Sequence, residues 1–264
     1  MVCTLHHISP SSVPSGSTLL LSSQPLQPGT LPHIAGSDLP ERVAVGSFFS
    51  PQGQGTWVQV QGHCWLPGQS RAVGYWVTTH LPLAQDMLPC LLHMTTSGFS
   101  LAWITLSDSG IQRKRKDNSG PQIPELVSNC LPLSLSQGFL LPDDASSIQS
   151  LLTHLALTEK FDLIITTGGT GVAPRDVTAD VTAALVQKRL AGFEQAMMNA
   201  SLAVTPHAII SRAVVGILGT TLIINLPGSP KGVRENLAPL LPALHHTLNK
   251  IHGDPTDCAS LNPH

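Results

Sequence analysis

The chain has 264 residues, a formal net charge of −2 and only 11% charged residues. This balance offers no cationic surface for nucleic acid, and no apolar run reaches the ~18 residues that a membrane-spanning helix needs. The first residues also lack the basic start of a signal peptide. We therefore expect a cytoplasmic protein that binds neither nucleic acid nor a membrane.

The cysteines and histidines show no metal-site spacing. The five cysteines include no Cys-x-x-Cys pair and are scattered, at Cys3, Cys64, Cys90, Cys130 and Cys258. An odd number of scattered cysteines predicts free thiols in a reducing compartment. The twelve histidines include two adjacent pairs, at residues 6–7 and 245–246, and we expect structural or surface roles for them.

Residues 1–98 predict an N-terminal extension in two parts. Residues 1–35 are rich in Ser, Pro and Leu without a sustained period, which predicts an irregular arm. Residues 43–49, 56–61 and 72–79 are short segments rich in valine and aromatic residues, and they predict a small antiparallel β module. The aromatic residues of this module are interpreted as core rather than as a ligand face. The sequence assigns the module no role.

Strands and helices alternate from Ser100 onward. Apolar runs predict strands at residues 101–106, 138–141, 161–165, 214–218 and 221–226. Between them we predict a helix capped by Ser119, an amphipathic helix with apolar residues at 148, 151, 152 and 155, and helices at 177–187 and 193–200. A last helix carries leucines from 237 to 248 and is expected to be kinked by Pro239 and Pro242.

This alternation predicts an α/β domain over residues 99–253, followed by a tail at 254–264. We expect three layers, in which helices cover both faces of a mainly parallel sheet. Ligands of such sheets bind beyond the carboxyl ends of the strands. The loops that follow the predicted strands are therefore the place to look for a site.

The glycine loop, residues 166–176, follows the strand at 161–165. Its backbone N–H groups, with no bulky side chains in the way, form a natural cradle for phosphate. Arg175 and Asp176 place a cation and a carboxylate beside that cradle. Asp176 suits Mg²⁺, which takes one or two protein carboxylates and fills its other positions with phosphate oxygens and water. Alternatively, Asp176 caps the helix that starts near Val177.

Three further segments are expected at the same edge of the sheet. Asp143 follows a second strand and would hold Mg²⁺ together with Asp176, although the adjacent Asp144 competes for this role. Asp108 either contributes to the site or only orders its own turn. The Pro-Gly-Ser loop, residues 227–229, offers more N–H groups for a second anion, or is simply a stiff turn. The basic run at 113–116 is either a solvated loop or a segment that folds over phosphates.

The whole string around the glycine loop adds a resemblance. Residues 166–178 read Thr-Thr-Gly-Gly-Thr-Gly-x-x-x-Arg-Asp-Val-Thr, which resembles the signature of the molybdenum-cofactor biosynthesis domain family. This family includes molybdopterin adenylyltransferases and the gephyrin G domain. The likeness runs from about residue 100 to 253. It includes Leu-Ser-Asp-Ser at 106–109, Asp-Asn-Ser-Gly at 117–120, Pro-Asp-Asp at 142–144, Gly-Phe-Glu-Gln-Ala-Met at 192–197, Ser211-Arg212 and Leu-Ile-Ile-Asn-Leu-Pro-Gly-Ser-Pro-Lys at 222–231.

The resemblance implies transfer of AMP from Mg-ATP to the phosphate of molybdopterin, with release of pyrophosphate. It implies that Asp143 and Asp176 are catalytic and bind Mg²⁺. It also implies a homotrimer, and a downstream molybdenum-insertion protein as partner. The residues implied to bind nucleotide and pterin are Ser107, Asp108, Thr167, Gly168, Gly169, Thr170, Gly171, Arg175, Pro227, Gly228 and Ser229.

Two alternatives stay open at this stage. The chain can be a catalytically silent pterin-binding or scaffold protein of the same pathway, although a pure scaffold need not keep Asp143, Asp176 and an unbroken glycine loop. It can also be a bifunctional enzyme with a second activity in residues 1–98. Cys64 and Cys90 are the cysteines in or beside the β module, and neither shows a recognisable partner pattern.

Overall fold

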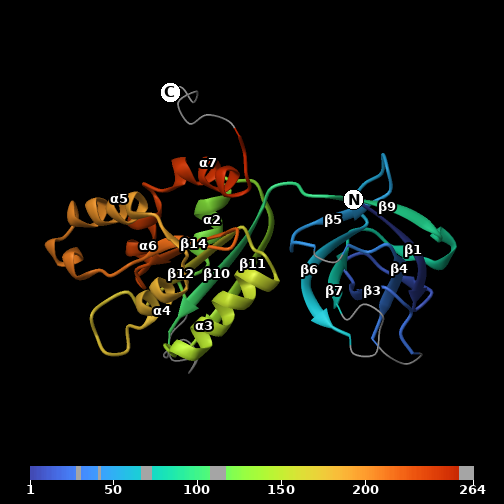
Figure 1. Ribbon diagram of the computed structural model, residues 1–264, viewed down its shortest axis with the longest axis horizontal. Helices are drawn as coiled ribbons and strands as arrows, with labels where there is room; N and C mark the ends of the chain where they lie inside the picture. The colour runs from blue at the N-terminus through green and yellow to red at the C-terminus, as the bar shows by residue number, and fades with distance from the viewer. Residues whose placement is uncertain (28–30, 41–42, 67–72, 108–116, 256–264) are drawn as a thin grey trace. The chain divides into compact units, whose positions relative to one another are not determined.

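The computed structural model describes residues 1–27, 31–40, 43–66, 73–107 and 117–255. The chain divides into two units, Met1–Gly98 and Phe99–His264 (Figure 1). Among the described residues, no helix has both the length and the apolar character needed to cross a bilayer.

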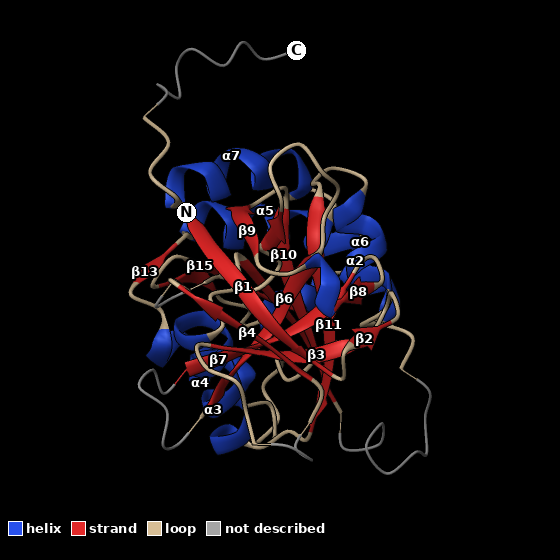
Figure 2. Cartoon of the chain, turned by 90° about the vertical axis from the view of Figure 1, so that its right-hand side faces the viewer, coloured by secondary structure: helices blue, strands red, loops and turns tan. Residues whose placement is uncertain are grey.

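The first unit is a closed barrel of seven strands in the order β1-β4-β3-β7-β6-β5-β9; Figure 1 labels these strands, and Figure 2 shows the strands of the chain in red. Neighbouring strands are antiparallel except for the parallel pair β3–β4. A separate two-stranded sheet joins β2 to β8. The strands are β1 Val2–Ser9, β2 Ser12–Val13, β3 Thr18–Ser22, β4 His33–Ser37, β5 Phe48–Ser50, β6 Val58–Trp65, β7 Val73–Thr79, β8 Leu83–Ala84 and β9 Cys90–Thr95, with a short 3₁₀ turn η1 at Gln85–Met87.

The prediction of an irregular arm at residues 1–35 is wrong, because these residues supply β1 to β3 and the start of β4. The register of β1 against β4 shifts between Leu5 and His7, so Leu5 and Ile8 are both buried although they are three residues apart. A bulge of this kind breaks the two-residue period on which strand prediction depends.

The aromatic residues of the barrel divide between core and surface. Trp57 and Tyr75 are buried, and the Tyr75 hydroxyl donates to the Pro40 carbonyl (2.6 Å), whereas Trp65 is 76% exposed. The predicted core role therefore holds for Trp57 and Tyr75 and is wrong for Trp65, which lies at the end of β6. Cys3 is also buried, and its burial, together with the nearby Asp38, raises the pKa of its thiol to about 12. The described cysteines, Cys3, Cys64, Cys90 and Cys130, form no disulfide, which agrees with the prediction of thiols.

The second unit is built on a six-stranded sheet in the order β11-β10-β12-β15-β14-β13. The four strands from β11 to β15 in this order run parallel, and β14 and β13 extend the sheet antiparallel. The strands are β10 Phe99–Leu106, β11 Leu133–Leu141, β12 Leu163–Thr167, β13 Lys188–Arg189, β14 Val215–Leu218 and β15 Thr221–Leu226. The predicted α/β fold with a mainly parallel sheet is confirmed.

Helices cover both faces of this sheet. The α-helices are α2 Gln122–Ser128, α3 Ala145–Thr153, α4 Thr178–Leu185, α5 Ala191–Leu202, α6 Pro230–Leu237 and α7 Leu241–Ile251, with a π-helical turn η2 at His154–Thr158 and a 3₁₀ helix η3 at Pro206–Ile210. Apolar residues of α2, α6 and α7 pack on one sheet face, against Leu163, Ile165 and Ile224. Strand side chains alternate, so Ile164 and Ile223 point to the other face, where α3 and α4 lie (Figure 1).

The last predicted helix is two helices rather than one kinked helix. α6 ends at Leu237 and α7 begins at Leu241, with Pro242 in its first turn. Proline removes a backbone donor and disfavours helical geometry in the residue before it. Two prolines three residues apart therefore end one helix and start the next.

Candidate functional site

The loops after β10, β12 and β15 meet at one edge of the sheet. The Gly168 N–H donates to the Leu226 carbonyl (3.1 Å), and Thr167 Oγ1 donates to the Pro227 carbonyl (2.8 Å). A Cβ at position 168 would lie 2.6 Å from the Leu106 carbonyl oxygen, and one at position 228 would lie 3.2 Å from the Gly168 Cα. The structure thus brings together the glycine loop, the Pro-Gly-Ser loop and the end of β10, and glycine is required where their backbones touch.

The glycine loop presents unpaired backbone donors. The N–H groups of residues 169–172 have no hydrogen-bond acceptor within the part of the chain that the structure describes. Carbonyls of the same segment are occupied, because Arg212 donates from its backbone N–H to Thr170 (2.9 Å) and from Nε to Gly171 (2.7 Å). In a trans peptide the N–H points away from the C=O, so the N–H groups of Gly171 and Val172 face away from Arg212. Successive free N–H groups of this kind bind anions.

In the Pro-Gly-Ser loop, too, the carbonyls are bonded to the protein while the N–H groups face the other way. The Gly228 carbonyl accepts from Ser119 Oγ (2.8 Å), while the Pro227 carbonyl is bound by Thr167 as described. The N–H groups of Gly228 and Ser229 therefore point to the opposite side of the loop. Ser229 also caps α6, since its Oγ accepts from the Gly232 N–H (3.0 Å). The loop is a stiff turn and a donor surface at once.

Ser119 is not the cap of α2, so that prediction is wrong. Its hydroxyl is committed to Gly228, and the N-cap position belongs to Pro121. Asp117 organises the turn instead, because one carboxylate oxygen accepts from the Ser119 and Gly120 N–H groups and the other from Thr105 Oγ1 (2.6 Å). The Asp-Asn-Ser-Gly segment thereby ties the end of β10 to the Pro-Gly-Ser loop.

Asp176 lies directly over the glycine loop and does not cap α4. Helix α4 has no side-chain cap, and Asp176 Oδ2 accepts from the Ala173 N–H (2.9 Å). A Cβ at position 171 would lie 2.6 Å from this oxygen. Asp176 Oδ1 has no hydrogen-bond partner among the described residues, so it is available to a ligand. Arg175 is exposed and forms no ion pair within the described segments.

The two adjacent aspartates after β11 have different surroundings. Asp144 is the N-cap of α3: its Oδ2 accepts from the Ser147 N–H (2.8 Å), and this bond lowers the pKa of the Asp144 carboxyl. Asp144 therefore serves the helix. Asp143 is half-buried and lies two residues after Leu141, the last residue of β11, whose carbonyl accepts from the Ser107 N–H (3.0 Å). Asp108 and the basic run at 113–116 lie outside the described residues.

The residues present fit a magnesium ion that is completed by phosphate. No group of three or more His, Cys, Asp or Glu side chains able to hold a metal occurs among the described residues. Mg²⁺ needs only one or two carboxylates when phosphate oxygens and water supply its other positions. Asp176, with one unused oxygen beside a row of free N–H groups, matches that requirement.

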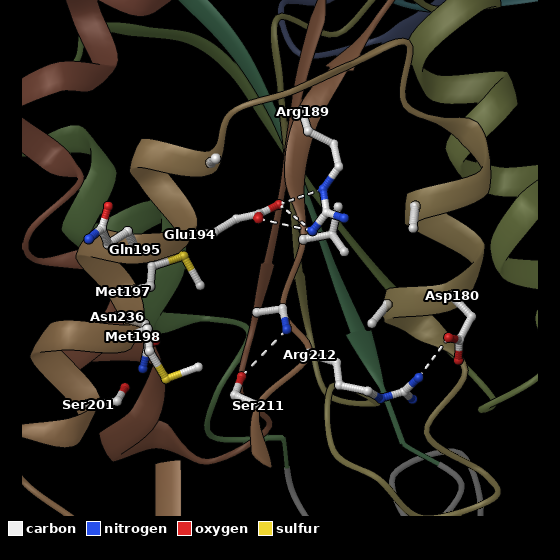
Figure 3. Close-up of a pocket in the computed structure, with 15 residues that line it drawn as sticks. Asp180, Arg189, Glu194, Gln195, Met197, Met198, Ser201, Ser211, Arg212 and Asn236 are labelled. Atoms are coloured by element: carbon white, nitrogen blue, oxygen red, sulfur yellow. Dashed lines mark hydrogen bonds and ion pairs between the residues drawn. The ribbon is translucent and has the colours of Figure 1, made fainter. Parts of the chain in front are cut away.

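Two pockets lie in this part of the second unit, and one of them adjoins these loops. The first, which we call the loop pocket, has a volume of ≈ 430 Å³ and is lined by Thr170, Gly171, Pro227 and Ser229, with further residues of α6 and η3. The second, which we call the α4–α5 pocket, has a volume of ≈ 510 Å³ and is lined by residues of α4, α5 and the segment 211–214 that precedes β14 (Figure 3). Arg212 lines the α4–α5 pocket and contacts the glycine loop, so it stands between the two regions.

Sequence reasoning missed two residues that support the site. Asn225 is fully buried in β15; its amide donates to Thr166 Oγ1 and Thr182 Oγ1 (3.0 Å each), and its carbonyl oxygen accepts from the Val214 N–H (3.3 Å). A polar asparagine inside an otherwise apolar strand is the sequence feature that could have indicated a buried supporting role for Asn225. Arg212 was visible only as part of a quoted motif, because its partners are backbone carbonyls that no sequence pattern reveals.

Comparison with known proteins covers the second unit. The family described as a probable molybdopterin binding domain matches residues 102–246. Gephyrin of Dictyostelium discoideum is 41% identical over 164 residues, or 58% of this chain and 22% of that protein. Molybdopterin adenylyltransferase of Helicobacter pylori is 38% identical over 152 residues, or 57% of this chain and 86% of that protein. The crystal structure of the molybdopterin biosynthesis enzyme MoaB from Thermus thermophilus aligns with a TM-score of 0.56 and 40% identity, covering 60% of this chain and 99% of that chain.

The matched region contains Asp143, the glycine loop and the Pro-Gly-Ser loop, whereas the barrel lies outside it. The chain spans less than a quarter of the length of gephyrin but most of the length of the Helicobacter protein. Over this region its identity to these proteins, the family match and the shared fold agree. The chain therefore belongs to the molybdopterin-binding domain family of molybdenum cofactor biosynthesis.

Proposed function

We propose that the protein is a molybdopterin adenylyltransferase, which transfers AMP from Mg-ATP to the phosphate of molybdopterin. The observation that carries the proposal is the row of four unpaired N–H groups at residues 169–172, with the Asp176 carboxylate lying over the same loop. A phosphate cradle beside a carboxylate that can hold Mg²⁺ is the arrangement that phosphoryl and nucleotidyl transfer requires.

The reaction needs two phosphates held close together, and the two loops offer two sets of donors. A phosphate oxygen of molybdopterin attacks the α-phosphorus of ATP, a new P–O bond forms, and the bond to pyrophosphate breaks. The backbones of the two loops approach closely at Gly168 and Gly228, so anions bound on them would be neighbours. Holding both reactants in line supplies much of the rate, with little covalent chemistry from side chains.

Asp143 and Asp176 would hold Mg²⁺, which supplies charge neutralisation for the phosphates. The loop pocket, at ≈ 430 Å³, is of the size that ligand pockets usually have, and it opens beside both loops. It would take one of the two ring systems, pterin or adenine. The Helicobacter relative, whose name states this activity, aligns over 86% of its length, which supports the same assignment here.

We also expect the working form to be a homotrimer. Four apolar side chains at the end of α5 and in η3 are 40% to 71% exposed, which is costly for a surface left in water: Leu202, Val204, Ile209 and Ile210. Sedimentation equilibrium of the full chain should give a mass near three times 27.9 kDa. An Ile209→Asp variant should dissociate, and a monomeric wild type would contradict the expectation.

Three aspartate variants test the catalytic assignment with ATP labelled at the α-phosphate. Asp176→Asn and Asp143→Asn should each lower kcat by ~100-fold or more while binding of molybdopterin persists. Asp144→Asn is the matched control, because asparagine is also a good helix cap and Asp144 serves only α3. Full activity of Asp176→Asn, or a loss in Asp144→Asn as large as in Asp143→Asn, would overturn the assignment.

A further inference from the structure

Arg212 makes an unusual set of contacts with the glycine loop. Its backbone N–H donates to the Thr170 carbonyl (2.9 Å), its Nε to the Gly171 carbonyl (2.7 Å) and its Nη2 to the Asp176 carbonyl. Its Nη1 donates to Asp180 Oδ1 (2.6 Å), in the first turn of α4. Figure 3 shows the guanidinium and the Asp180 carboxylate pointing toward one another. One side chain thus holds the glycine loop at Gly171 and at Asp176, and also holds the first turn of α4 at Asp180.

The segment that Arg212 holds has few other restraints. Residues 172–175 are exposed, and this segment closes on itself through two bonds between Ala173 and Asp176. Arg212 binds the carbonyls at both ends of the excursion, at Gly171 and at Asp176. The Asp176 carboxylate is therefore placed relative to the free N–H groups by the guanidinium rather than by packing.

We propose that Arg212 is the positioning residue of the site, which fixes the Asp176 carboxylate over the anion cradle and turns the loop N–H groups outward. Each of its three guanidinium nitrogens already donates to a protein oxygen, so it acts through the loop and Asp176 rather than on the substrate. The expected effect of Arg212 on kcat rests on the proposed adenylyl transfer, whereas its effect on the position of the glycine loop and Asp176 does not.

The geometry requires a guanidinium. A planar fork with donors on Nε, Nη1 and Nη2 reaches three fixed acceptors at once, whereas the ammonium of lysine is a single point with rotating donors. Lys at this position keeps the charge but cannot hold both Gly171 and Asp176 in place. Charge alone is therefore insufficient, and the conservative substitution becomes informative.

Arg189 provides a matched control. It also lines the α4–α5 pocket and pairs with a carboxylate, Glu194 (2.9 Å), but it makes no contact with the glycine loop. Arg212→Gln, Arg212→Lys and Arg189→Gln therefore remove one guanidinium each from the same region. Asp180→Asn weakens only the outer partner of Arg212, and its effect should lie between those of Arg212→Lys and Arg189→Gln.

Two measurements on the full chain test the proposal. Amide hydrogen exchange at Ala173, Asp176 and Thr178, whose N–H groups are hydrogen-bonded within this segment, should rise by ~tenfold or more in Arg212→Gln and Arg212→Lys but not in Arg189→Gln. In adenylyl transfer, both Arg212 variants should lose ~100-fold in kcat with a much smaller change in the KM for ATP, since misplacement by about 1 Å has that cost. Wild-type exchange and wild-type kcat in Arg212→Lys would overturn the proposal. A loss of kcat in the Arg212 variants that is fully explained by their unfolded fraction would also overturn it.

The two proposals fail differently. If the wild-type chain transfers no AMP, the proposed function is wrong. The role of Arg212 is then decided by two measurements on the wild type and the Arg212 variants: the amide exchange described above and the affinity for magnesium pyrophosphate, which probes the anion cradle. Weaker binding and faster exchange in both Arg212 variants would then support loop positioning, and unchanged values would refute it. If the wild type is active and the Arg212 variants match it, only the inference on Arg212 falls.

Discussion

Replacing Gly169 with alanine should destabilise the second unit through one identifiable clash. Gly169 has φ +64, and a Cβ there would lie 2.1 Å from Thr178 Oγ1 and 3.1 Å from Thr178 Cβ. Thr178 is fully buried, so its side chain has no room to yield. The Thr178 N–H also donates to the Gly169 carbonyl (3.2 Å), and any shift that relieves the clash strains this bond.

The magnitude follows from two terms. Alanine in the left-handed region costs ~1 kcal/mol or slightly more. Forcing an extra methyl into a packed position costs about 1–3 kcal/mol. The free energy of unfolding should therefore fall by about 2–4 kcal/mol. Thr178 Oγ1 is buried without a hydrogen-bond partner among the described residues, so removing this hydroxyl should offset the loss of the buried Thr178 methyl group, and Thr178→Ala by itself should be close to neutral.

Urea unfolding followed by far-UV circular dichroism measures this effect. The α-helices of the described residues all lie in the second unit, so the signal at helical wavelengths reports that unit. The double variant Gly169→Ala/Thr178→Ala should recover about 1–3 kcal/mol of the loss, because the Oγ1 clash is gone while the backbone strain remains. A Gly169→Ala variant within ~0.5 kcal/mol of wild type, or a double variant with no recovery, would refute the reasoning.

Three further predictions follow from other contacts. Gly171→Ala should change stability by less than ~1 kcal/mol but lower kcat, because its Cβ would displace only the carboxylate end of the Asp176 side chain, 2.6 Å away; an unchanged kcat would contradict this. Asn225→Ala should lower the free energy of unfolding by about 2–4 kcal/mol, since it removes three hydrogen bonds from buried groups; urea unfolding measures the loss, and a near-neutral result contradicts it. The bond of His252 to Asp162 (3.1 Å) raises the pKa of His252 above 6.5, so its stabilisation is fully present below about pH 6.5 and is lost as the pH rises through the raised value. The contribution of this pair to the free energy of unfolding should be below ~1 kcal/mol, because the imidazole is about a third exposed. His252→Gln should remove this contribution from the pH profile of the free energy of unfolding.

The buried strands β10, β12, β14 and β15 and the glycine loop were predictable from the sequence, whereas β13 and the first half of β11 were not. Each buried strand is a continuous apolar run that ends in glycine, proline or a small polar residue, and the parallel arrangement forces their ends to one edge. The gathering of the glycine loop and the Pro-Gly-Ser loop follows from this rule alone. The accessible N–H groups of the glycine loop were also predictable, because glycine has no side chain to cover the backbone.

Other features depend on contacts that a sequence does not display. The bulge between Leu5 and His7 hid the first strand of the barrel, since a shift of one residue breaks the alternating pattern. Asp143 and Asp144 are chemically identical neighbours, and only the bond from Ser147 shows which one caps α3. Ser119 was expected to cap a helix and instead bonds to Gly228, 109 residues away along the chain.

The most direct test of the proposed function is a single-turnover incubation of the full chain, in excess over molybdopterin, with Mg²⁺ and ATP labelled at the α-phosphate. The account predicts that the label moves to the pterin, that one pyrophosphate is released for each pterin adenylylated, and that both products disappear in Asp176→Asn. Molybdopterin that stays bound without acquiring label would contradict the account and identify the chain as a pterin-binding scaffold.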